Sequence, residues 1–94
     1  MVEYLYNCIR ATAGQDALII ANIAEDGEDI TAGMSLMLHA ENKEMIINVD
    51  GEYIDGLWNF TIPAEATKGR QGKHWYCLQR DGINVCFHEP IYLV

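Results

Sequence analysis

The sequence of 94 residues has little positive charge, little proline and no long apolar run. It contains 6 Lys and Arg against 14 Asp and Glu, and the resulting net charge of −8 repels phosphate backbones and anionic lipids. No run of about 18 apolar residues occurs, and the start MVEYLYNCIR lacks the basic and apolar segments of an export signal. We therefore expect neither nucleic-acid nor membrane binding, and a protein without a signal peptide.

Hydrophobic residues, in contrast, are abundant, at 50% of the chain. That proportion is enough for one core, so we expect a single domain over residues 1–94. Without an export signal, the three cysteines are expected to be reduced thiols in a reducing compartment.

Turn-forming residues recur at short intervals, with Asp-Gly pairs among them. The runs between them are about five to ten residues long and rich in Ile, Val, Leu, Tyr and Trp, which predicts an all-β sandwich or barrel of antiparallel strands. Helix is predicted only as a short turn at residues 63–69, PAEATKG, where Pro63 lies near the start and Gly69 at the end.

Alternation along the strands predicts which side chains face the core. Trp58, Phe60 and Ile62 point to one side of LWNFTI, and Leu36 and Leu38 are the inner pair of GMSLMLHA. The strand DALIIANIA is different because it is apolar on both faces. We expect its outer residues to be covered by the N-terminal segment or by a partner.

The segment YCLQRDGINVCF, residues 76–87, predicts a hairpin with Asp81-Gly82 as a two-residue type I′ turn. Counting outward from the turn sets Cys77 opposite Cys86, Tyr76 opposite Phe87 and Trp75 opposite His88. One face of the hairpin then belongs to the core, with Tyr76, Leu78, Val85 and Phe87. The opposite face carries Trp75, Cys77, Gln79, Asn84, Cys86 and His88.

The opposed cysteines leave three interpretations open. They are two reduced thiols, a strained disulfide across a non-hydrogen-bonded pair with Cα atoms about 4.5 Å apart, or part of a metal site with His88. No CxxC pair or further ligand cluster accompanies them, so we predict no metal.

Other chemistry has little support in the sequence. A cysteine on a flat strand face lacks the pocket and oxyanion donors of a nucleophilic enzyme. The acidic segment AEDGED, residues 24–29, lacks the ligand spacing of a calcium loop, and no glycine-rich loop opens a helix. We therefore predict no enzyme activity and no cofactor.

Four segments carry a resemblance to a known family. They are AGQDALIIANIAEDGEDITAG (13–33), LWNFTIPAEATKG (57–69), GKHWYCLQRDG (72–82) and CFHEPIYLV (86–94). In this order they resemble the immunoglobulin-like domain of tailed-phage baseplate upper proteins and related small prophage tail proteins. The chain departs from the family pattern in three places. The Asp-Leu/Ile-Thr-Gly step has one extra residue at 29–33, His74 replaces an aromatic residue, and Glu89 replaces a frequent glycine.

The resemblance implies an antiparallel two-sheet immunoglobulin-like β-sandwich of about seven strands. It also implies a structural assembly module that is made in the bacterial cytoplasm and then enters a virion, with other tail subunits or its own copies as partners. The candidate contact residues are Trp75, Leu18, Ile20, Met37 and His88.

The resemblance further places the last strand at one side of a sheet. Pro90 suits an edge strand, and the final IYLV would pair with another strand, in this chain or in a neighbouring subunit. The alternative function is a carbohydrate- or cell-surface-binding module, in which Trp75, Tyr76 or Tyr53 would stack on a sugar.

Overall fold

The computed structural model describes residues 2–5, 8–84 and 89–94. Its strands form one large sheet, one small sheet and a separate two-stranded hairpin. The large sheet runs β1 (Val2–Leu5), β2 (Cys8–Ala11), β12 (Glu89–Leu93), β10 (Gly72–Arg80), β6 (Met34–His39) and β7 (Met45–Asp50), with β11 (Ile83–Asn84) also paired to β10. The small sheet runs β3 (Ala17–Ala21), β9 (Leu57–Ile62) and β8 (Glu52–Ile54), and β4 (Ala24–Glu25) pairs only with β5 (Glu28–Asp29).

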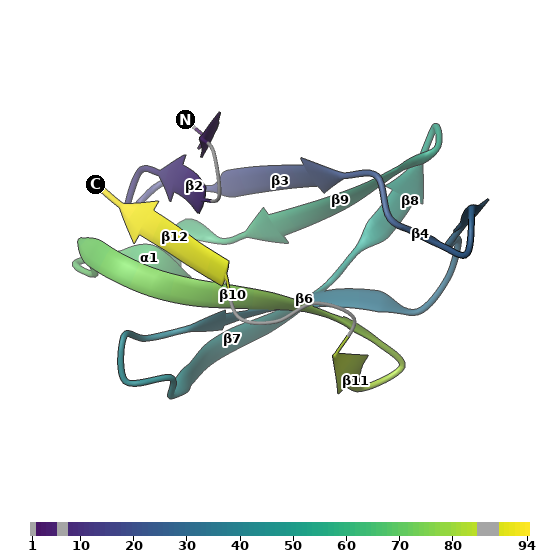
Figure 1. Cartoon of the computed structure of the whole chain (residues 1–94). Coiled ribbons are helices and arrows are strands. Elements are labelled where there is room, and N and C mark those ends of the chain that lie inside the picture. The colour runs from purple at the N-terminus through teal and green to yellow at the C-terminus, as the bar shows by residue number, and fades with distance from the viewer. Residues whose placement is uncertain (1, 6–7, 85–88) are drawn as a thin grey trace.

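The two sheets form the predicted sandwich, with the small sheet lying over the large one (Figure 1). All strand pairs are antiparallel except β2 with β12. The predicted helical turn is also confirmed, as α1 (Ala64–Thr67). Its first turn follows Pro63, and the Ala64 amide donates a hydrogen bond to Asp16 Oδ1 at 2.8 Å.

The core lies between the inner faces of the two sheets, as the alternation predicts. Phe60, Ile62, Leu36 and Leu38 are all 0% exposed, and Trp58 is 3% exposed. Each such side chain contributes roughly 1.5–3 kcal/mol through its burial. The Trp58 indole N–H also donates to the Ile30 carbonyl at 2.6 Å, so the buried polar atom has a partner.

The chain passes from the large sheet to the small sheet at Gly51. A Cβ atom there would lie 2.6 Å from the Phe60 ring and 2.7 Å from the Trp58 ring, so no larger residue fits without a shift of the core. The Gly51 amide donates to the Met34 carbonyl at 2.9 Å, which holds the backbone in this position. The Asp-Gly pair at 50–51 is therefore a close backbone approach and not a hairpin turn.

The Asp81-Gly82 hairpin is confirmed close to its turn. Asp81 has φ 50° and Gly82 has φ 83°, the two positive values that a type I′ turn requires. Arg80 pairs with Ile83, and Gln79 pairs with Asn84, as predicted.

Further from the turn, the predicted register of this hairpin is wrong. Tyr76 pairs with Glu89 where Phe87 was expected, and Trp75 pairs with Pro90 where His88 was expected. The reason is a difference in length: β10 has two residues between the two ladders, and the opposing segment has four, 85–88. A shift of two residues keeps every β10 side chain on its predicted face. The predicted pairs Leu78–Val85 and Cys77–Cys86 involve residues outside the described ones.

The closing strand is not the edge strand that we expected. Ile91, Tyr92 and Leu93 of β12 pair in parallel with Ile9, Arg10 and Ala11 of β2, so β12 lies inside the sheet. Pro90 precedes this parallel ladder, where its missing N–H costs no bond to β2. The end of the chain therefore pairs within its own chain, and its pairing does not require a neighbouring subunit.

Candidate functional site

The outer face of the small sheet carries four large aliphatic side chains that are exposed to solvent. Leu18 and Ile20 on β3 are 46% and 41% exposed, Ile54 on β8 is 47% exposed, and Leu57 at the start of β9 is 39% exposed. We call these four residues the apolar face. Strand register places them together, because Ile54 pairs with Leu57 while Leu18 and Ile20 pair with Thr61 and Asn59 of the same β9 strand.

In its described part, the N-terminal segment contacts this sheet at the edge strand β3. The Ile20 amide donates a hydrogen bond to the Tyr4 hydroxyl at 2.7 Å, which satisfies one backbone group of the open β3 edge. The apolar side chains nevertheless stay exposed, so the described part of the N-terminal segment does not provide the expected cover. We predicted that the N-terminal segment or a partner covers the outer residues of this strand, and cover by a partner remains a prediction.

The strands that form the apolar face, and the turn after β8, supply negative charge and no positive charge. Strands β3, β8 and β9 contain no Lys or Arg, whereas Glu52 lies on β8 and Asp55 lies in the turn after it. Glu52 pairs with Asn59, which is itself the partner of Ile20, so its carboxylate borders the aliphatic group.

The other predicted contact residues, Trp75 and Met37, lie on the outer face of the large sheet. The register pairs Cys77 with Met37, and Trp75 is two residues from Cys77 on the same side of β10. The five predicted contact residues therefore do not form one surface: two lie on the small sheet, two lie on the large sheet, and His88 is outside the described residues.

The side chain of Trp75 is half-buried and contacts three other residues. Its indole N–H donates to the Glu41 carbonyl at 3.3 Å, and the Lys73 and Lys43 ammonium groups lie 4.5 Å and 5.5 Å from its ring centroid. Cations at these distances from a tryptophan ring make cation–π contacts. Trp75 is thus the centre of a basic and aromatic cluster in an acidic protein.

Cys77 lies on the outer face of β10, as predicted, but it is only 1% exposed. Its thiol donates to Asn84 Oδ1 at 3.9 Å, and the same oxygen accepts a bond from Gln79 Nε2 at 2.8 Å. Cys86 is outside the described residues, so the pairing of the two thiols stays a prediction. Cys8, at the start of β2, is half-buried.

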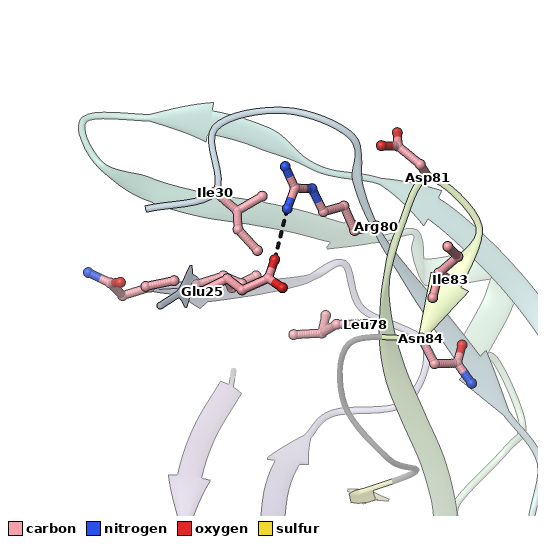
Figure 2. A pocket seen from close by; sticks show the side chains of 10 residues that line it. Glu25, Ile30, Leu78, Arg80, Asp81, Ile83 and Asn84 are labelled. Carbon is pink, nitrogen blue, oxygen red and sulfur yellow. Dashed lines mark hydrogen bonds and ion pairs between the residues drawn. The ribbon is translucent and has the colours of Figure 1, made fainter. Parts of the chain in front are cut away.

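A pocket of about 740 Å³ opens beside the β10–β11 hairpin, and the sequence reasoning did not anticipate it (Figure 2). Ile23, Ile30 and Leu78 contribute apolar walls, and an ion pair of 2.9 Å joins Arg80 to Glu25. Figure 2 shows this ion pair linking β10 to the β4 side of the pocket. Because the two sides come from segments some 55 residues apart, no local sequence signal could have found it.

The charged side chains in the described lining of the pocket are Glu25, Arg80 and Asp81. Its described lining contains no histidine, cysteine or serine. Elsewhere among the described residues, no group of three or more His, Cys, Asp or Glu side chains is placed to hold a metal ion. The described part of the chain also contains no helix of the length and apolar character needed to cross a membrane.

The three aromatic residues considered for sugar stacking do not share a surface. Trp75 is on the outer face of the large sheet, whereas Tyr76 packs against the core from the inner face. Tyr53 lies against Trp58, with ring centroids 5.4 Å apart.

Comparison with known proteins identifies the fold and no more. No family model and no curated protein matches the chain. Among solved structures, the crystal structure of the Lin-41 filamin domain superposes on it with a TM-score of 0.64, covering 90% of this chain and 82% of that chain at 10% sequence identity. The predicted immunoglobulin-like β-sandwich is thereby confirmed.

Proposed function

We propose that the chain is a non-enzymatic structural module that binds a different protein through the apolar face of its small sheet. The observation that carries this proposal is the exposure of Leu18, Ile20, Ile54 and Leu57, at 39–47%, on one side of a three-stranded sheet. Grouped apolar side chains of this kind mark contact sites on soluble proteins more often than isolated ones do.

The partner should combine an apolar surface with basic residues at its rim. Glu52 and Asp55 border the face, and its three strands supply no cation. Two copies meeting through this face would bring like charges together, which disfavours self-pairing here. A stable contact buries about 800 Å² on each partner, so the four aliphatic residues would form the centre of a larger interface.

The setting that we propose is a phage or prophage tail or baseplate. It is supported by the resemblance of the four segments described above and by a fold that suits such a module. The module would be made in the bacterial cytoplasm and incorporated into the virion.

Incorporation into particles tests both parts of the proposal. A phage or induced lysogen that lacks the gene would be complemented with wild type, with Leu57→Glu, or with Asn48→Glu as the matched control. Asn48 is exposed on the outer face of the large sheet, so this control adds the same carboxylate away from the apolar face. Purified particles would then be assayed for the chain by mass spectrometry.

We expect wild type and Asn48→Glu in the particles and at least a tenfold loss of Leu57→Glu, which should remain folded by circular dichroism. Equal incorporation of Leu57→Glu would refute the apolar face as the contact. Absence of the wild-type chain from the particles would refute the virion role.

A further inference from the structure

The large sheet carries a second surface, of opposite character to the apolar face. Tyr92 of β12 pairs with both Lys73 of β10 and Arg10 of β2, so these three residues form a row across the sheet. Lys73 also lies over Trp75, and Lys43 approaches the same ring. We call Arg10, Lys43, Lys73, Trp75 and Tyr92 the basic–aromatic patch.

Among the side chains that the structure describes, the ion pair Arg80–Glu25 is the one found, and it involves none of Arg10, Lys43 and Lys73. The strand partner of Arg10 on β1 is Glu3, whose side chain is outside the described ones. Tyr92 is 40% exposed, and Trp75 is half-buried. Aromatic residues and cations at one place are typical of interface anchors.

The same molecule carries a complementary element, the β4–β5 hairpin. Its strands pair only with each other, across a turn in which Asp26 has φ 52° and Gly27 has φ 80°. Its four carboxylates are all exposed, and one of them contacts Arg80. They belong to Glu25, Asp26, Glu28 and Asp29.

The hairpin and the patch cannot meet within one molecule. The hairpin is tied to Arg80, at one end of β10, and the patch includes Lys73, near the other end. Seven residue steps along the strand, at about 3.3 Å each, separate these two positions by about 23 Å. Figure 1 shows β4 at one end of the molecule, and the C-terminal end of β12 at the other.

We infer that the acidic β4–β5 hairpin of one copy docks on the basic–aromatic patch of a second copy. Such a head-to-tail contact uses two different surfaces, so each added copy presents a free hairpin and a free patch. It therefore generates rings or filaments, depending on the rotation between copies.

The net charge of −8 does not prevent this contact at physiological salt. The Debye length at about 0.15 M is roughly 8 Å, well below the 37 Å length of the molecule. Repulsion between remote charges is then screened, while opposite charges in contact still attract each other. At about 1 M salt, where the Debye length is roughly 3 Å, the contact should weaken as well.

The test uses two variants that each lose one half of the contact. Lys43→Gln with Lys73→Gln removes two positive charges from the patch, and Glu28→Gln with Asp29→Asn removes two negative charges from the hairpin. The matched control is Lys68→Gln with Arg70→Gln, which removes the same number of charges at exposed positions after α1. Each protein would be sized by light scattering and sedimentation over a range of concentrations.

We expect wild type and the control to associate with increasing concentration, and each of the two variants alone to remain monomeric. Mixed together, the two variants should form one-to-one dimers that grow no further, because one intact hairpin and one intact patch remain. A monomeric wild type, a control that dissociates like the patch variant, or a mixture without dimers would each overturn the inference. These outcomes are independent of the apolar face, because Leu57→Glu leaves both surfaces intact.

Discussion

The outer faces of the two sheets are built by the same strand alternation but differ in what covers them. On the large sheet, the outward Cys77 is 1% exposed, although it points away from the core. On the small sheet, the outward Leu18 is 46% exposed. Cys77 has Met37 as its cross-strand partner and Asn84 Oδ1 at 3.9 Å from its thiol, whereas Leu18 pairs with the short Thr61. An outward-pointing side chain is therefore not always exposed. Exposed aliphatic side chains on an outer face are notable because no neighbouring side chains in the described part of the chain cover them.

The largest expected difference in stability is between carboxylates placed on the outer faces of the two sheets. Cys77→Asp should lower the free energy of unfolding by about 3 kcal/mol or more, because it places a charged carboxylate at a buried position. Leu18→Asp should cost about 1 kcal/mol or less, since the side chain is exposed and strand propensity is the main loss. Urea unfolding followed by tryptophan fluorescence measures both, and similar losses for the two variants would remove the contrast between the faces.

A second test addresses the core that separates the two faces. Gly51→Ala should cost about 1–3 kcal/mol, because the added methyl group overlaps the rings of Phe60 and Trp58. Gly56→Ala is the control: its added methyl meets nothing within 4 Å, although its φ of 81° adds some backbone strain. If the shorter side chain of Phe60→Leu does not reduce the cost of Gly51→Ala in a double-mutant cycle, the steric explanation is wrong.

The smallest effect is expected at the cations over Trp75. Lys73→Met keeps most of the side chain and removes its charge, so the free energy of unfolding should fall by roughly 0.5–1 kcal/mol. Lys43→Met should cost less, because its ammonium group is 5.5 Å from the ring against 4.5 Å for Lys73. The same unfolding assay compares them, and a larger loss for Lys43→Met would contradict the assigned geometry.

The sequence predicts best what local spacing determines. Alternation was enough to place Trp58 and Phe60 inside, and Asp81-Gly82 fixed the first pairs of its hairpin. The register predicted beyond Gln79 was wrong because four residues, 85–88, lie opposite only two residues of β10 between the two ladders. A two-residue turn gives no sign of this difference in length.

Features that depend on distant segments were not predictable in the same way. The parallel pairing of Ile91 with Ile9 joins the two ends of the chain, and the Arg80–Glu25 ion pair closes a pocket between segments that no local pattern connects. For the proposed contact surface, the sequence indicated Leu18 and Ile20, because their strand is apolar on both faces. It missed Ile54 and Leu57, which join them only through β9.

The central claim is that the apolar face is covered by a different protein in the assembled particle. The most direct measurement replaces Leu18 with a photo-crosslinking amino acid and irradiates assembled particles, with the same replacement at the exposed Asn48 as the reference. We predict one crosslinked product at position 18, containing another virion subunit, and no such product at position 48. No product at position 18, or a product made only of two copies of this chain, would contradict the account.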